Sequence, residues 1–117
     1  MPAATEIRLK DKGRRLEVAF DDGSLFDLPA EYLRVESPSA EVQGHAPHQK
    51  QIVGGRRHVC IIGIEPVGHY AIRLSFDDLH ETGIFSWDYL LELGRYRDEK
   101  WRAYLDALAA RGLSRDP

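Results

Sequence analysis

Apolar and polar residues alternate near the start of the chain in the way expected of half-buried β-strands. The apolar positions of this pattern are Ile7, Leu9, Leu16, Val18 and Phe20. A period of two places such side chains on one face of a strand. Asp11-Lys12-Gly13 lies between the two runs and is typical of a turn. We therefore predict that the two strands pair as a β-hairpin.

A second turn, a short strand and a short helix are predicted next. Asp21-Asp22-Gly23 has the composition of a turn, and residues 25–28 form a short apolar run. Pro29 suits the first turn of a helix, because the N–H that proline lacks has no partner there. We expect this helix to continue to about Val35 and to stop before Pro38.

The middle of the chain divides into a long loop and a hydrophobic strand. Residues 37–55 are rich in Ser, Pro, Gly, His and Gln without apolar periodicity, which predicts a long ordered or semi-ordered loop. Long loops in small domains are often functional. Residues 58–65 are nearly all apolar, which is typical of a central strand covered on both faces. Cys60 within this run is then expected to be a buried, inert thiol.

The last third of the chain predicts another strand and two helices. Residues 70–76 alternate again, and residues 84–85 extend briefly. Ser86 is a suitable N-cap for a helix through Leu93, which Gly94 ends. A final amphipathic helix is indicated by apolar residues at positions i, i+3, i+4 and i+7, where core packing is the default interpretation of the aromatic rings. These residues are Trp101, Tyr104, Leu105 and Leu108.

The two halves of the chain resemble each other. Phe20-Asp21-Asp22 and Phe76-Asp77-Asp78 are each followed by a short strand and a helix. This echo is compatible with a duplicated β-β-α unit, with shared turn chemistry and with chance. We predict an α+β fold with antiparallel strands in two β-β-α-like halves and a C-terminal amphipathic helix. One domain spans residues 1–117, with the long loop at 37–55 and the last helix and tail at 96–117.

Composition limits the classes of function. The 117 residues are 43% hydrophobic and carry a formal charge of -3 with mixed signs, which fits one core and argues against a nucleic-acid surface. Cys60 is the only cysteine, so an internal disulfide is impossible, and a reducing cytoplasm suits the chain. The first ten residues do not form a signal peptide, and no apolar run approaches the roughly 20 residues of a membrane span.

Several residue groups have simple structural interpretations. The paired aspartates of the two acidic turns fit turn hydrogen bonding better than acid–base catalysis. The segment 54–58, GGRRH, precedes a strand and lacks the Lys-Ser or Lys-Thr of a phosphate-binding loop. His45 and His48 lie three residues apart and, with His80 and nearby carboxylates, have the donor types for a divalent metal. A solvated polar loop is the alternative interpretation of these histidines.

Three segments resemble a known domain family. They are YLRVESPSAEVQGH at 32–45, EPVGHYAI at 65–72 and FDDLHETGIFSWDYL at 76–90. From about Glu6 to Leu93 the chain resembles the stand-alone bacterial form of the gamma-butyrobetaine hydroxylase-like N-terminal domain, also called family 971 of the domains of unknown function. The resemblance implies an α+β domain. Such domains occur alone, in front of iron- and 2-oxoglutarate-dependent carnitine-pathway hydroxylases, or attached to iron–sulfur cluster carrier ATPases.

The resemblance also implies that a metal site has been lost. In the hydroxylases, three loop cysteines and a later histidine hold a structural zinc ion. The cysteine positions correspond here to Ser37, Ser39 and Val42, and the histidine corresponds to His80. Serine hydroxyls are hard, weakly acidic donors and valine has no donor, so a thiolate zinc site cannot form from them. We therefore expect the fold to be stabilised by apolar burial alone.

The domain associations of the family favour a non-catalytic accessory domain. It would dock to an oxygenase or an iron–sulfur carrier protein, without nucleic acid, membrane or cofactor. The hydroxylase activity of larger relatives belongs to a domain absent here, and the sequence contains no recognisable catalytic triad. The alternative is an iron- or zinc-binding protein that uses His45, His48 and His80. A third hypothesis, a small enzyme, requires a pocket with convergent polar groups.

Overall fold

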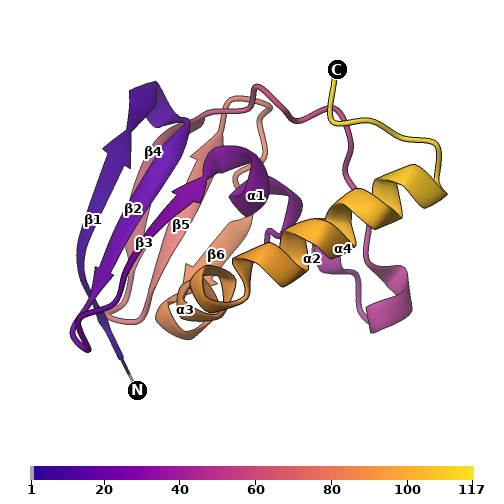
Figure 1. Cartoon of the computed structure of the whole chain (residues 1–117). Coiled ribbons are helices and arrows are strands. Elements are labelled where there is room, and N and C mark those ends of the chain that lie inside the picture. The colour runs from indigo at the N-terminus through magenta and orange to yellow at the C-terminus, as the bar shows by residue number, and fades with distance from the viewer. Residues whose placement is uncertain (1) are drawn as a thin grey trace.

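Alternating apolar residues in the first half build an antiparallel sheet with one buried face. The computed structural model describes residues 2–117, and in it a third strand extends the predicted hairpin to the order β1-β2-β3. Leu16, Val18 and Phe20 are buried on the inner face, while Arg15 and Glu17 lie on the outer face. The elements of this half are β1 (Ala4–Lys10), the 3-10 helix η1 (Asp11–Gly13), β2 (Arg15–Phe20), β3 (Leu25–Pro29) and α1 (Ala30–Val35) (Figure 1).

The second half repeats this arrangement. Another antiparallel sheet has the order β4-β5-β6, and a helix follows it directly, as α1 follows β3. The prediction of an α+β fold with two β-β-α-like halves and a C-terminal helix is confirmed. The elements of this half are β4 (Ile61–Val67), β5 (Ala71–Phe76), β6 (Gly83–Ser86), α3 (Trp87–Arg95) and α4 (Arg97–Ala110).

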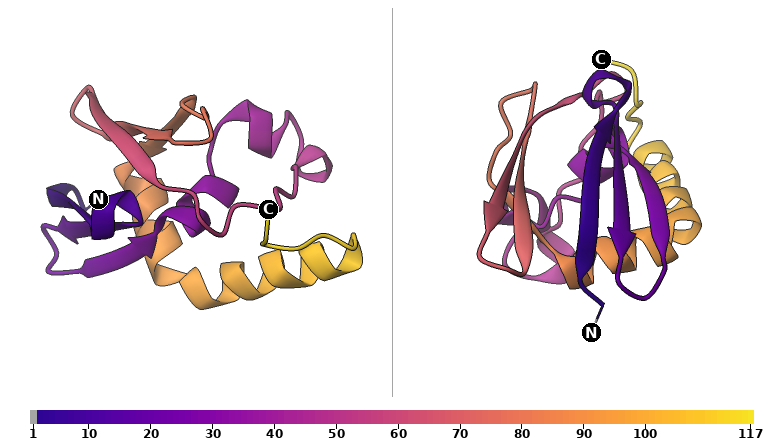
Figure 2. Two further views of the ribbon diagram at one scale, coloured as in Figure 1. Left: turned by 90° about the horizontal axis from the view of Figure 1, so that it is seen from above. Right: turned by 90° about the vertical axis from the view of Figure 1, so that its left-hand side faces the viewer.

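The two sheets face each other across one hydrophobic core, as Figure 2 shows. Val18 of β2, Leu74 of β5 and Leu90 of α3 are all fully buried in this core. Tyr104 and Leu108 of α4 form a second cluster with the end of α1, as the aromatic stripe predicted, whereas Leu105 of the same stripe is 38% exposed. None of the helices in residues 2–117 combines the length and the apolar composition that a bilayer crossing requires.

Two glycines allow elements of the two halves to approach closely. Gly13 has a φ of +91°, and a Cβ there would overlap the carbonyl oxygen of Ile61 at the start of β4. A Cβ at Gly94 would overlap the ring of Phe26 on β3. The prediction that Gly94 ends its helix was wrong, because α3 continues to Arg95. Close packing, not capping, explains the glycine at this position.

The apolar run at 58–65 forms an edge strand and not the predicted central strand. Among the described strands, β4 pairs with β5 alone. Ile62 lies at an irregularity in this pairing and is 65% exposed. Cys60 precedes the strand and is half-buried, so the prediction of a buried core thiol was also wrong. Hydrophobicity alone does not say whether a further strand or helix covers such a run.

The segment 37–55 contains more regular structure than predicted. The side-chain oxygen of Ser39 accepts a hydrogen bond from the N–H of Glu41 at 3.2 Å and so caps one helical turn. This turn buries one apolar side chain, Val42, which is too little to produce a periodic pattern. The elements of this segment are α2 (Ala40–Gln43) and the 3-10 helix η2 (Pro47–Gln49).

Candidate functional site

The loop after α1 meets the turn between β5 and β6 in a buried polar cluster. Ser37 Oγ lies 2.9 Å from His80 Nε2, and Ser39 Oγ lies 2.7 Å from Thr82 Oγ1. Ser37 is fully buried and His80 is 5% exposed. Gly83 permits this approach, because a Cβ there would overlap Ser37 Oγ. The fold thus brings together side chains that are 43 residues apart in sequence.

The positions that correspond to the zinc ligands of the resembling hydroxylases do not fit zinc here. Ser37 Oγ accepts the N–H of Ser39 at 3.3 Å and faces the ring of His80. Val42 is buried in α2 and has no donor atom. Two hydroxyls and one imidazole do not replace a thiolate set for zinc. The loss of the zinc site stays a prediction, and this donor set accords with it.

His80 faces oxygen atoms at both ring nitrogens. Its Nδ1 lies 3.3 Å from Glu41 Oε2, while Nε2 faces Ser37. Burial, together with the charge of Arg34, lowers the pKa of His80 below its ordinary value, against the opposing charge of Glu41. A neutral ring suits the geometry, since Nδ1–H then donates to Glu41 and Nε2 accepts from the Ser37 hydroxyl. Both nitrogens are engaged in this arrangement.

Asp78 in the same turn joins two arginines. Arg34 Nε and Arg56 Nε each donate to Asp78 Oδ2 at 2.7 Å, and the N–H of His80 donates to Oδ1 at 3.3 Å. Burial alone raises the pKa of Asp78, but the hydrogen bond and charge of Arg34, with those of its other partners, bring it below the ordinary value. Arg34 Nη1 is buried without a hydrogen-bond partner among the described residues. Asp78 therefore does more than the predicted turn bonding.

The remaining candidate metal ligands are dispersed. His45 is exposed and its backbone N–H donates to Gln49 Oε1 at 2.8 Å, and His48 is exposed in η2. Within residues 2–117, no three His, Cys, Asp or Glu side chains gather in a way that could hold a metal ion. Iron or zinc binding at His45, His48 and His80 stays a prediction, and the positions of these three residues give it no support.

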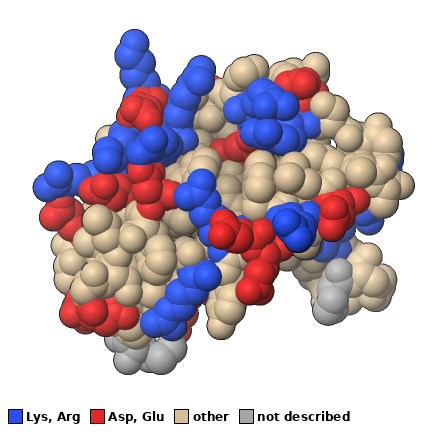
Figure 3. All heavy atoms as spheres, viewed as in Figure 1, with Lys and Arg blue, Asp and Glu red and all other residues tan. Residues whose placement is uncertain are grey.

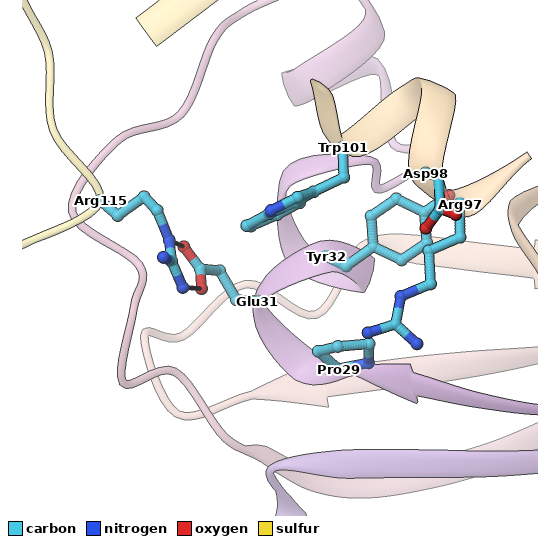
Figure 4. Close-up of a pocket in the computed structure, with 7 residues that line it drawn as sticks. All are labelled: Pro29, Glu31, Tyr32, Arg97, Asp98, Trp101 and Arg115. Atoms are coloured by element: carbon cyan, nitrogen blue, oxygen red, sulfur yellow. Dashed lines mark hydrogen bonds and ion pairs between the residues drawn. The ribbon is translucent and has the colours of Figure 1, made fainter. Parts of the chain in front are cut away.

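A second candidate site lies between α1, α4 and the C-terminal tail (Figure 4). Glu31 of α1 is 6% exposed and accepts two hydrogen bonds from Arg115, at 2.8 Å from Nε and 2.7 Å from Nη2. The guanidinium carbon lies 5.2 Å from the centroid of the Trp101 ring. The cavity has a volume of about 280 Å³, and its lining is Pro29, Glu31, Tyr32, Arg97, Asp98, Trp101 and Arg115.

The aromatic wall of this cavity belongs to the folded core. The rings of Tyr32 and Trp101 meet edge to face, with centroids 6.2 Å apart. The Tyr32 hydroxyl donates to the carbonyl oxygen of Leu93 at 2.7 Å, and burial raises the pKa of this hydroxyl well above its ordinary value. The Trp101 ring also contacts Tyr104, with centroids 5.1 Å apart. These contacts hold the wall in place independently of Arg115.

Sequence reasoning did not predict this second site. Glu31 and Arg115 are 84 residues apart, and neither belongs to a recognisable motif. Trp101 was interpreted as core, and it does pack half-buried against the core, but it also lines the cavity. Nothing in the spacing of the chain signals that the tail folds back onto α1.

Comparison with known proteins identifies the family. The family model for the gamma-butyrobetaine hydroxylase-like N-terminal domain matches residues 7–91. Two NMR solution structures cover the whole chain, one at 47% identity (TM-score 0.84, 92% of that chain) and one at 45% (0.86, 87%). A 1.93 Å crystal structure of a DUF971-family protein of unknown function from Acidithiobacillus ferrooxidans is 43% identical, with a TM-score of 0.66, over 79% of this chain and 92% of that one. A search of curated proteins found no match. The chain belongs to the gamma-butyrobetaine hydroxylase-like N-terminal domain family.

Proposed function

We propose that this chain is a non-catalytic accessory domain that docks onto a protein partner through the outer face of the sheet β4-β5-β6. The family resemblance suggests the partner class, an oxygenase or an iron–sulfur cluster carrier. One observation carries the proposal: within residues 2–117, no helix covers this weakly charged sheet face (Figure 2).

The outer face of this sheet has little unpaired charge. The strand register places Arg73 between Glu65 and Ile84. Arg73 and Glu65 form an ion pair at 2.8 Å, so each neutralises the other. Ile84 is 46% exposed and Ile62, on the edge strand, is 65% exposed. Little unpaired charge on this face lowers the desolvation cost of covering it, which supports docking here.

The edge of β4 adds a second means of contact. Among the described strands β4 pairs with β5 alone, so its other edge is free for a strand of the partner. Pro66 has no N–H and limits such pairing to the part of β4 that precedes it. That part contains Ile62 and Ile64, which are both exposed.

The polar cluster around His80 supports a structural role for these groups. Both ring nitrogens of His80 and the carboxylate of Asp78 are engaged by neighbouring side chains. A general acid or base needs a face that a substrate can approach, and His80 is 5% exposed. This burial favours an accessory function over catalysis.

The test compares two lysine variants on the two sheets. Ile62→Lys places a charge on edge strand β4, at the border of the proposed docking surface, while Leu25→Lys places the same charge on edge strand β3 of the other sheet, where Leu25 is 61% exposed. The tagged full chain is expected to co-purify from its native host with an oxygenase or iron–sulfur protein, identified by mass spectrometry. Ile62→Lys should remove most of this protein and Leu25→Lys should retain it. Equal retention would refute the docking surface, and no enriched partner would refute the function.

A further inference from the structure

The C-terminal tail returns to the body of the domain after α4. In residues 111–117, the carbonyl oxygen of Ser114 accepts the N–H of Gly55 at 2.9 Å, and that of Arg115 accepts the N–H of Arg57 at 3.0 Å. The tail therefore lies along segment 54–57 and is joined to it by two backbone hydrogen bonds. This course places the side chain of Arg115 in the wall of the cavity between α1 and α4, beside Glu31 and Trp101 (Figure 4).

The cavity recognises a guanidinium group in two ways. Glu31 accepts a forked pair of hydrogen bonds from the Nε and Nη2 atoms of Arg115, and this pairing raises the pKa of Arg115. The central carbon of the same guanidinium lies over the face of the Trp101 ring, 5.2 Å from its centroid. A lysine ammonium offers neither the planar fork nor the flat stacking surface. The site therefore has the chemistry to select arginine over lysine.

The tail is held more weakly than the cavity walls. Leu113 is 45% exposed, and Ser114 and Asp116 are exposed as well, so the side chains that anchor the tail are Arg115, on buried Glu31, and Asp116, in an exposed ion pair with Arg57. The core contacts of Tyr32 and Trp101 involve no residue of the tail. Departure of the tail would uncover the Glu31 carboxylate, which is 6% exposed while Arg115 covers it, and leave it without its cation. A carboxylate beside an aromatic wall favours capture of another cation of matching shape.

We propose that the Glu31–Trp101 edge of this cavity is a binding site for an arginine side chain of a partner protein, and that the chain's own Arg115 holds that position until such an arginine displaces the tail. The backbone N–H groups of Gly55 and Arg57, which now bond the tail, would then serve the partner's segment. The inference goes beyond the docking function and involves no residue of the β4-β5-β6 face. Either proposal can therefore fail without the other.

The test removes the Arg115 side chain from Glu31 and Trp101 in the full-length chain and offers a small probe in its place. Arg115→Ala is titrated with N-acetyl-arginine amide, and the indole N–H signal of Trp101 is followed by NMR. The indole of Trp87 donates to the carbonyl oxygen of His69 at 2.8 Å, away from the cavity, and serves as the internal control. We expect a saturable shift of the Trp101 signal in Arg115→Ala. The unchanged chain, in which Arg115 already holds Glu31 and Trp101, should show none at the same probe concentration.

Two further titrations test the recognition chemistry. N-acetyl-lysine amide should bind Arg115→Ala more weakly, and adding Glu31→Gln should lower the affinity for the arginine probe by about tenfold or more. If Arg115→Ala does not fold, Arg115→Lys keeps a cation beside Glu31, and the arginine probe should displace that lysine with the same Trp101 shift. The proposal is overturned if the folded variant shows no saturable shift, or if lysine and arginine probes bind equally.

Discussion

The two sheets share one topology but carry their charges in different places. The outer face of β1-β2-β3 is dense with ion pairs, including Lys10 with Glu17 at 3.1 Å and Arg15 with Asp27. Basic and acidic groups accordingly interleave over the hairpin β1–β2 in Figure 3. The outer face of β4-β5-β6 has the single pair Arg73–Glu65 among the described residues. The first sheet therefore carries more paired charge on its outer face than the second, which is the difference on which the proposed docking surface depends.

In the acidic turns the contrast is reversed, because the turn of the second half has the ionic contacts and the turn of the first half is mostly solvated. Asp22, in the turn between β2 and β3, is exposed, and its Oδ1 accepts the N–H of Ser24 at 2.9 Å. Asp78, in the corresponding turn of the second half, bonds two arginines and lies beside buried His80. The same Phe-Asp-Asp sequence thus serves a solvated turn in one half and a buried junction in the other. Local sequence specifies the turn, and its surroundings decide what else it does.

The largest loss of stability is expected from a substitution at Gly13, where the two halves of the domain are in contact. Gly13→Ala introduces a side chain at positive φ and forces it against the backbone of Ile61. Gly23 has a nearly identical φ of +89° but nothing within 4 Å, so Gly23→Ala measures the backbone strain alone. We expect Gly13→Ala to lower the free energy of unfolding by roughly 3 kcal/mol or more, and Gly23→Ala by about 1 kcal/mol. Urea denaturation measures both, and equal losses would mean that the halves do not meet at Gly13.

A second matched pair compares the acidic turns. Asp78→Asn leaves Arg34 and Arg56 without their shared carboxylate, and we expect a loss of about 2 kcal/mol in the free energy of unfolding. Asp22→Asn keeps an oxygen for the same turn bond and should change stability little. Thermal unfolding of the two variants gives the comparison. Similar melting temperatures would show that the buried junction contributes no more than the exposed turn.

The elements were predictable where the signal is local. Alternation at Leu16, Val18 and Phe20 predicted a strand, and Ser86 does cap α3, accepting the N–H of Tyr89 at 3.1 Å. These features depend on a residue and its close neighbours. The edge position of β4 was missed, because an apolar run does not say whether another element covers it.

The candidate sites were less predictable because they join distant segments. The contact of Ser37 with His80 followed from a family resemblance, not from spacing. The pairing of Glu31 with Arg115 had no signal at all, since a charged residue in a polar tail usually remains in solvent. Gly94 was interpreted as a helix end because glycine is common there, whereas here it makes room for Phe26.

The smallest change in the free energy of unfolding is expected on acidification, and it should come from His80 in the second half. Burial lowers the pKa of His80 below its ordinary value of 6.5, so the unfolded chain binds a proton at a higher pH than the folded chain does. The contribution of His80 to stability is therefore complete above pH 6.5 and is lost as the pH falls through the folded pKa. The free energy of unfolding, measured in urea from pH 7.5 downward, should begin to fall near pH 6.5. His80→Gln should remove this part of the pH dependence, whereas His58→Gln, which changes an exposed histidine, should retain it. If the free energy of unfolding of His80→Gln depends on pH as that of the unchanged chain does, then another group causes the acid sensitivity. In that case the buried turn of the second half would not differ from the solvated turn of the first half in its response to acid.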